Sequence, residues 1–500
     1  MVAVGMAALA VGACRPGGGT EARPSSDTLI VVLPREPEQL DPRFVADPQG
    51  LKVSRLIFGS IVRIDPVTLE PVPDLAEEVT QQSPTRWRVR LREGLRFSDG
   101  STLDAQDVIA TFRGVVDPDL GSPYRGTYDR ITRMEAPDPR TVVFHLDAPH
   151  ATFLTDLELP ILRAEDEHRQ VARAGGAAPI GAGPYRLRSW DAGHLALTAN
   201  PRWHGGRPDH PKVRMIVVRD DNTRALRLLA GAGNLAVQAV PPLLVPLFED
   251  DARFEVRSGP GVATTYLGVN TQAGPLADAR VRRALAHAID RRALVEAKYG
   301  GRARLAQGWI PPGHWAHAED LPTHDHSSER ARALLEEAGV GDLRVTLRVG
   351  SDRFRTSVAH ALAAMLRRVG ITVDVRPSEM ATLIADLGHG RFELALMELP
   401  ELIEPHLLSW FFASHRIPDA GGAGANRWRY ADPVVDAALE RGRRTSERAA
   451  RVAAYRVVQH ELATDLPVIP LWHEDVVVVN DRRASGFEVP RNARLDPLAR

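Results

Sequence analysis

Three glutamates follow a predicted buried strand closely, and their carboxylates could bind a cationic group. The strand is expected over the apolar run at residues 392–397, and Glu398, Glu401 and Glu404 come after it within seven residues. Carboxylates attract cations and accept charge-assisted hydrogen bonds from them. The spacing therefore favours a cationic ligand. Because glutamate is mostly a surface residue, we expect at least one of the three to be an exposed loop charge.

Residues that would carry covalent or zinc chemistry are scarce or wrongly spaced. Cys14 is the only cysteine, and no Gly-x-Ser-x-Gly nucleophile elbow occurs. His460 and Glu461 begin like a zinc-protease helix, but Thr464 stands where the second histidine would be required. We expect no enzyme, and a periplasmic hydrolase is the disfavoured alternative.

Two further sets of polar residues could have either a structural or a chemical role. Four histidines crowd one loop: His314, His317, His324 and His326. Histidine is a common metal ligand, but the irregular spacing and the lack of a partner cysteine disfavour a metal site. Turn and helix-cap duties explain three aspartates: Asp99, Asp104 and Asp107. We therefore expect no cofactor and no metal.

Aromatic and amide side chains of the second half could line a ligand cleft. The tryptophans in question are Trp309, Trp315, Trp410 and Trp428. An aromatic wall suits a peptide or sugar, although core packing is an equally good explanation for each ring. Asn270 either hydrogen-bonds a ligand main chain or fixes a hinge.

These residues must be positioned by the elements around residues 264–312. A strand is predicted at 265–270, and Asp278 is a plausible N-cap for the helix that follows. Apolar residues recur on one face of that helix at Val281, Leu285 and Ile289. A single helix is expected to run on to Gly300, which would end it.

Elsewhere strands and helices alternate. Strands are expected at 28–33, 85–91, 141–146, 213–219, 343–349 and 371–375, and helices at 51–62, 223–230, 327–338, 355–369 and 448–462. Such alternation implies open α/β sheets. A chain of 500 residues is too long for one ordinary core, so two or more domains are expected.

Composition agrees with a globular protein that has no nucleic-acid partner. The chain is 44% hydrophobic and 25% charged, with a formal net charge of −1. Of its 63 basic residues only Lys52, Lys212 and Lys298 are lysine, a bias that we attribute to a GC-rich genome. The uncharged run 228–248 is interrupted by three prolines, so we expect a helix end, a turn and a short helix instead of a membrane span.

The N-terminal residues have a pattern that is typical of a lipoprotein signal peptide. Residues 2–13 are apolar and small, Val11-Gly12-Ala13-Cys14 looks like a lipobox, and residues 15–26 form a polar tether. We expect the thiol of Cys14 to be acylated. No Lys or Arg precedes the apolar run, which is consistent with a start inside a longer signal peptide.

Several ordered blocks resemble one known family. They are Tyr266-Leu-Gly-Val-Asn-Thr with the Asp-x-Arg-Val-Arg-x-Ala-Leu helix after it, Leu40-Asp41-Pro42, residues 91–108, Gly181-Ala-Gly-Pro-Tyr185, and Asn200-Pro-Arg-Trp-His-Gly-Gly. Together they are similar to the solute-binding proteins of the peptide/nickel-binding ABC-transporter family, family 5, over roughly residues 28–480.

The resemblance implies an α/β fold of the periplasmic-binding-protein type (type II, cluster C), with two lobes and an extra α+β subdomain. Lobe one would comprise 27–50, 180–263 and 477–500, the insertion 51–179, lobe two 264–476, and the leader and tether 1–26. The chain would cross between lobes near 265–270 and again near 467–477. A ligand would then lie between the lobes.

The resemblance also implies a role and a site. Glu401 falls on the aspartate that binds the ligand ammonium in peptide-binding members, whereas Glu398 and Leu402 replace the tryptophan and tyrosine of that motif. We expect a monomeric, lipid-anchored, periplasmic or cell-surface binder that delivers a peptide or peptide-like, possibly cationic solute to an ABC permease and ATPase. A nickel chelate, an oligosaccharide, an opine, and a sensory or chaperone role are the alternatives.

Overall fold

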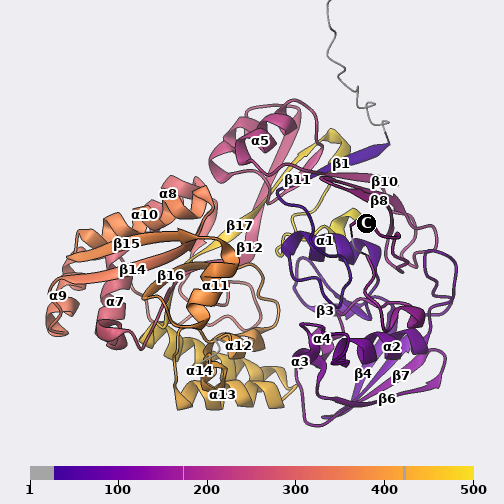
Figure 1. The fold of residues 1–500 in the computed structure, drawn as a ribbon, viewed down its shortest axis with the longest axis horizontal. Helices are drawn as coiled ribbons and strands as arrows, with labels where there is room; N and C mark the ends of the chain where they lie inside the picture. The colour runs from indigo at the N-terminus through magenta and orange to yellow at the C-terminus, as the bar shows by residue number, and fades with distance from the viewer. Residues whose placement is uncertain (1–26, 173, 420–423, 500) are drawn as a thin grey trace, which may run out of the picture.

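The structure is a computed structural model that describes residues 27–172, 174–419 and 424–499. The described chain forms two lobes, one at the left of Figure 1 and the other along its top and right. The expectation of a two-lobed α/β fold is thereby confirmed. The expected acylation site at Cys14 lies outside the described residues.

Lobe two, at the left of Figure 1, is a sheet covered by helices on both faces. Its strands are β13 (Ala303–Leu305), β14 (Leu343–Gly350), β15 (Ile371–Ser378) and β16 (Leu394–Leu399), together with halves of two longer strands. Its helices and 3-10 turns are η3 (Gly274–Ala277), α7 (Ala279–Ala288), α8 (Arg291–Tyr299), α9 (Ser328–Glu337), α10 (Arg353–Arg367), α11 (Met380–Gly388), η4 (Pro405–Leu407), α12 (Leu408–Phe412), η5 (Ser414–Arg416), α13 (Pro433–Arg444) and α14 (Arg448–Asp465). One core lies under α7–α10 and the other under α11–α14.

Lobe one has the same layered plan. Its strands are β1 (Thr28–Leu33), β8 (Tyr185–Asp191), β9 (His194–Ala199), β10 (Lys212–Val217) and β11 (Leu235–Val237), and its helical segments are α1 (Pro48–Ile57), α5 (Asp221–Leu229), η2 (Pro242–Leu244), α6 (Pro246–Glu249), η6 (Arg482–Ala484) and η7 (Asp496–Ala499). β1 lies between β10 and β11 and is parallel to both. Its alternating side chains supply one core with α1 and another with α5 and α6, which explains the continuous apolar run.

The insertion folds around its own core beside lobe one, at the lower right of Figure 1. It contains β2 (Val62–Ile64), β3 (Pro71–Pro73), β4 (Ala76–Ser83), β5 (Arg86–Leu91), α2 (Ala105–Val116), α3 (Arg125–Tyr128), β6 (Ile131–Asp138), β7 (Thr141–Leu146), α4 (Phe153–Asp156) and η1 (Ala164–Asp166). The predicted cap of α2 is confirmed, since the Asp104 carboxylate accepts from the backbone N–H of Gln106 at 2.8 Å. The carboxylate of Asp107 completes a capping box.

Two long strands connect the lobes: β12 (Phe254–Val269) and β17 (Val468–Asp481). They are antiparallel neighbours in both lobes. Their pairing is interrupted between Pro260 and Thr264, so three residues of β12 bulge where the chain passes between lobes. This bulge is the natural position for a hinge, because there the ladder of hydrogen bonds is locally broken.

The helix expected from Asp278 to Gly300 is two helices, which corrects the prediction. Asp278 does cap α7, but Ile289 is extended and the Asp290 carboxylate caps α8 by accepting from the N–H of Ala293 at 2.9 Å. The second cap stops the first helix, since an N-cap residue has an extended backbone. Gly300 ends α8 in the left-handed conformation at φ 56°, as predicted.

Two other boundaries differ from those expected. The helix predicted at 51–62 is α1, which starts at Pro48 and ends at Ile57, and its buried residues Val53 and Leu56 belong to the core of lobe one. The proposed boundary of the insertion therefore moves from residue 50 to about residue 58. The run 228–248 contains the short strand β11, which the expected helix end, turn and short helix did not include.

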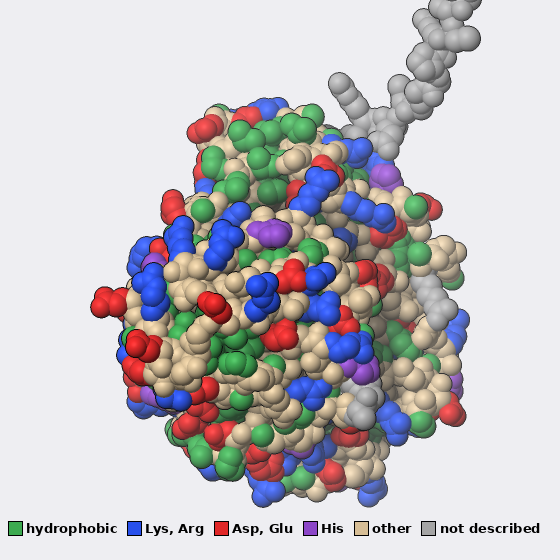
Figure 2. All heavy atoms as spheres, turned by 60° about the vertical axis from the view of Figure 1, so that its left-hand side comes forward, with side chains coloured by type: hydrophobic (Ala, Val, Ile, Leu, Met, Phe, Trp, Pro, Cys, Tyr) green, Lys and Arg blue, Asp and Glu red, His purple; other side chains and the backbone are tan. Residues whose placement is uncertain are grey.

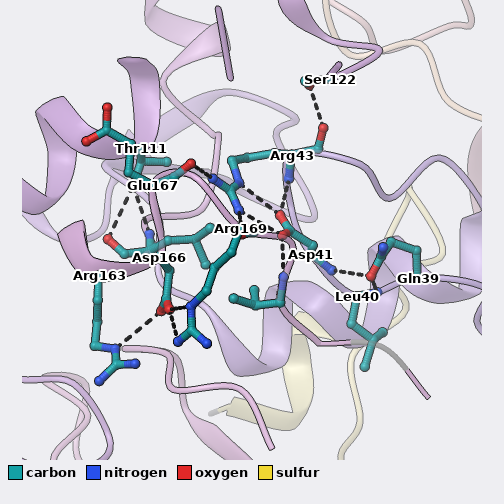
Figure 3. Close-up of polar contacts among 12 residues, drawn as sticks. Gln39, Leu40, Asp41, Arg43, Thr111, Ser122, Arg163, Asp166, Glu167 and Arg169 are labelled. Atoms are coloured by element: carbon teal, nitrogen blue, oxygen red, sulfur yellow. Dashed lines mark hydrogen bonds and ion pairs between the residues drawn. The ribbon is translucent and has the colours of Figure 1, made fainter. Parts of the chain in front are cut away.

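A buried ion pair ties the insertion to lobe one (Figure 3). Arg43 donates to Asp41 at 2.9 Å, and both side chains are inaccessible to solvent. The same guanidinium donates to the backbone carbonyls of Glu167 at 2.6 Å and Arg169 at 2.5 Å. The Leu-Asp-Pro triplet that contains Asp41 thus has a structural role, because it holds the segment after η1 against lobe one.

Surface features agree with the composition. On the face drawn in Figure 2, Lys and Arg side chains are interspersed with Asp and Glu. Within the described ranges, no helix combines the length and apolarity needed to span a bilayer.

Candidate ligand-binding site between the lobes

The loop that follows β16 lies where the two lobes touch. Leu402 is buried in the core of lobe two, whereas Ile403 packs against Ile64 and Leu69 of the insertion and against Val262 of the β12 bulge. We call this contact zone, formed by residues 401–404 with those three side chains and Arg494, the lobe seam. This loop therefore positions Glu401 and Glu404. Glu398 lies inside β16, because the strand runs to Leu399, two residues beyond its predicted end.

Glu401 is bound by an arginine from the end of the chain. Arg494 donates from Nε to Glu401 Oε1 at 2.8 Å and from its two terminal nitrogens to both carboxylate oxygens of Glu158. Its side chain is 3% exposed. Because Arg494 comes from the segment that packs on lobe one, the Glu401 contact joins the two lobes.

Glu398 and Glu404 are also neutralised by arginines. The Glu398 carboxylate pairs with Arg355 of α10, and that of Glu404 pairs with Arg451 of α14. The structure thus corrects the expectation of an exposed loop charge: each carboxylate is only partly exposed, since folding brings an arginine against it. A cationic ligand would have to compete with these guanidinium groups.

The predicted tryptophans divide by environment. Trp309 and Trp428 are 2% and 1% exposed, and both pack against Tyr266 in the core of lobe two. Their rings have no free face, so we assign them to core packing instead of a cleft wall. Trp410 is exposed and stacks on Arg416, whereas the Trp315 ring contacts the guanidinium groups of Arg448 and Arg451.

Asn270 lies away from the lobe seam. It directly follows β12, and its side-chain amide donates to the carbonyl of Phe392 at 3.1 Å. Phe392 precedes β16, whereas Glu398 lies near the opposite end of that six-residue strand, and Glu401 and Glu404 follow it. At about 3.3 Å per residue the two ends are roughly 20 Å apart. Asn270 therefore fixes a lobe-two turn and borders a surface hollow of about 500 Å³ outside the seam.

Comparison with known proteins identifies the family. The family model described as "Bacterial extracellular solute-binding proteins, family 5 Middle" matches residues 70–401. Protein XP55 of Streptomyces lividans is 32% identical over 96% of this chain and 89% of its own length. The chain belongs to the bacterial extracellular solute-binding proteins of family 5.

Two further known proteins match this solute-binding protein over nearly its whole length. The probable di/tripeptide-binding protein 5 of Pseudomonas aeruginosa is 27% identical, with 94% of both chains covered. The solved structure of the oligopeptide-binding protein AppA of Bacillus subtilis, in complex with a nonapeptide, superposes with a TM-score of 0.81 at 22% identity, covering 94% of this chain and 98% of that one. The latter similarity establishes the fold alone.

The histidine-rich loop of this solute-binding protein has backbone contacts. His314, His317 and His324 each hydrogen-bond a backbone carbonyl, that of Ile403, Ile310 and Ala463 respectively. Burial lowers the pKa of His314 to about 4, so its ring is neutral near pH 7. Among the residues that the structure describes, no group of three or more His, Cys, Asp or Glu side chains could hold a metal ion.

A second acidic group lies beside the hinge. Glu474 of β17 accepts hydrogen bonds from the hydroxyls of Thr265 at 2.9 Å and Tyr299 at 2.8 Å. Burial, followed by the nearby charge of Glu398, raises the pKa of Glu474 to about 7, although Arg355 opposes the shift. The sequence did not predict a role for Glu474, because an isolated glutamate in a crossing strand belongs to no recognisable motif.

The raised pKa of Glu474 predicts a pH effect on stability. The folded state holds this proton more tightly than the unfolded chain, whose glutamate pKa is near 4.5, so stability should fall as pH rises through this interval to about 7. Glu474→Gln should lose less stability than the parent between about pH 5 and about pH 8. Urea unfolding at both values measures the difference.

The exposed Glu78 of β4 provides the control for that comparison. Glu78→Gln should keep the parent pH profile. Parallel profiles for Glu474→Gln and the parent would contradict the assignment.

Proposed function

We propose that this protein is the extracytoplasmic substrate-binding component of an ABC importer and that it captures a peptide or peptide-like solute between its lobes. The main support for this proposal is the lobe seam, where the loop at 401–404 meets lobe one beside the bulge between Pro260 and Thr264. Two relatives at 27% identity, a probable di/tripeptide-binding protein and a di/tripeptide-binding protein of Pseudomonas aeruginosa, support the ligand class.

Binding is proposed to follow opening and closing of the seam. In the closed arrangement Glu401 and Ile403 touch groups of the opposite half, so a ligand must replace some of these contacts. Rotation about the bulge in β12 would separate the two surfaces while leaving both lobe cores intact. A ligand that contacts both surfaces then favours the closed state by its differential affinity for that state.

The membrane anchor, the transport partners and the monomeric state of this protein are also proposals. Cys14 would carry the lipid that holds the protein at the membrane, with residues 15–26 as tether. The partners would be an ABC permease and its ATPase, and the binder would act as a non-catalytic monomer. A sensory or chaperone role would use the same ligand site.

A ligand screen tests the peptide proposal. A mixture of di- and tripeptides should raise the melting temperature of the purified full chain, because a ligand that binds only the folded state stabilises it by about 2.7 kcal/mol at a concentration of one hundred times Kd. Mass spectrometry of the recovered complex identifies the bound species.

Three matched mixtures serve as controls: free amino acids, oligosaccharides and a nickel–histidine chelate. A shift given by one of these and by no peptide would contradict the proposed ligand class. It would leave the two-lobed binding mode in place.

A further inference from the structure

Glu401 and five charged side chains on its lobe-one side form a cluster. Their formal charges balance, since three are basic and three acidic: Lys52, Arg55, Arg494, Glu158, Glu401 and Asp496. The arginines bind the acids directly. Arg55 donates to Glu158 at 3.3 Å, and Arg494 connects Glu158 with Glu401.

Arg494 is held firmly in this position. Leu495 and Leu498, which follow Arg494, belong to the core of lobe one, and Tyr185 donates to the carbonyl of Leu498 at 2.8 Å. The guanidinium therefore reaches Glu401 from a fixed base. Its hydrogen bonds to Glu158 would survive separation of the lobes, so Arg494 stays beside the ligand path when the seam opens.

Lys52 adds a second cation beside Glu401. Burial lowers the pKa of Lys52 to about 8, and the charge of Glu401 is the opposing influence. It is one of only three lysines among 63 basic residues. A lysine ammonium is a compact charge whose pKa shifts when buried, unlike the guanidinium of arginine. The positive charge of Lys52 is thus only partly balanced by nearby negative charge. Another cation beside it would make the charged form of Lys52 less stable.

We infer that the ligand end that meets Glu401 is uncharged, and that Arg494 determines this specificity by satisfying the carboxylate from within the protein. This inference rests on the proposed function and narrows its ligand class to peptides whose amino terminus is blocked. It departs from the ammonium-binding role that the sequence resemblance implied for Glu401.

Charge balance explains the preference. A ligand ammonium would add a positive charge to a buried group that is already neutral overall, next to Arg494 and Lys52, and like charges that are close together and shielded from water repel strongly. An acylated amine brings only an amide, which can donate to a carboxylate oxygen and accept from Lys52. Because Lys52 could release its proton instead, the preference near pH 7 should be about tenfold.

A paired peptide library tests the inference. Identical di- and tripeptide sequences are prepared with free and with N-acetylated amino termini, pooled, and competed for the full-length protein in native mass spectrometry. The acetylated member of the best-bound pair should be favoured about tenfold over the free one, and isothermal titration of that pair should give the same ratio of Kd values.

Three variants test whether Arg494 causes the preference. Arg494→Gln leaves Glu401 without its guanidinium, so the preference should shift toward the free amine by at least tenfold. Arg483→Gln removes an exposed arginine of the same C-terminal segment and should keep the parent ratio. Arg494→Lys, which retains the charge, gives an intermediate ratio and serves if the glutamine variant does not fold.

The parent protein alone can overturn the inference. Tighter binding of free peptides by the parent would do so, and so would the absence of binding to either form. Tighter binding of the free form overturns the specificity inference and leaves the proposed function in place, whereas the absence of binding to either form contradicts the proposed function as well. An unchanged ratio in Arg494→Gln would remove Arg494 as its determinant.

Discussion

Replacing Asp41 with alanine should lower the free energy of unfolding by about 3–5 kcal/mol, the cost of breaking a buried ion pair by removing one partner. Asp41 and Arg43 are both inaccessible to solvent. Without the carboxylate, the Arg43 charge would remain buried with carbonyl partners only. The backbone N–H of Val171, which donates to Asp41 at 2.9 Å, would also lose its acceptor.

Chemical unfolding measures this loss, and two variants control it. Asp342→Ala alters an exposed aspartate in a loop of lobe two and should change stability by less than about 0.5 kcal/mol. The double variant Asp41→Ala/Arg43→Met removes both charges and should recover part of the loss, because no unpaired ion stays buried. A loss below about 1 kcal/mol for Asp41→Ala would mean that the pair does not anchor the insertion.

Replacing Gly261 with alanine should destabilise the protein by about 1–3 kcal/mol, the usual cost of overpacking, and force the crossing strands apart. A Cβ atom there would lie 2.3 Å from the carbonyl oxygen of Glu474 and 3.1 Å from a methyl group of Val476. The nearer atom belongs to the backbone, so no side-chain rotation can relieve the clash. The bulge itself must widen.

Small-angle scattering should detect this change as a larger radius of gyration, and chemical unfolding should detect the lost stability. Gly259→Ala in the same strand is the matched control, since its Cβ would meet only a side-chain methyl of Val489 at 3.3 Å. Equal scattering curves for the Gly261→Ala variant and the parent would argue against a hinge at the bulge.

Local patterns predicted most of the elements. β1 and β7 match the expected residues at both ends, because compact β-branched and apolar runs with turn residues on either side have few alternatives. The caps at Asp104 and Asp278 were also recognisable, since capping depends on residues within one helical turn. The break before α8 escaped notice because Asp290 looks like any other polar position on an amphipathic helix.

The partners of the site residues could not be predicted. Glu401 and Arg494 are 93 residues apart in the chain, and the Arg494–Glu158 contact spans 336. No periodicity links such positions, and their meeting depends on how the C-terminal segment packs on lobe one. For the same reason the sequence could not decide whether Trp309 and Trp428 face solvent or core.

The pairing of β12 with β17 across both lobes has a mechanical consequence. Two independent linkers would let the halves slide, twist and separate in any combination, and each of these freedoms would be lost on capture. A hydrogen-bonded ribbon resists sliding along its length and yields mainly where its ladder is interrupted. Because the ladder is also irregular between Thr265 and Tyr266, bending should concentrate in the short stretch from Pro260 to Tyr266. Few relative motions of the lobes are then available, so little configurational entropy is lost when the lobes close on a ligand.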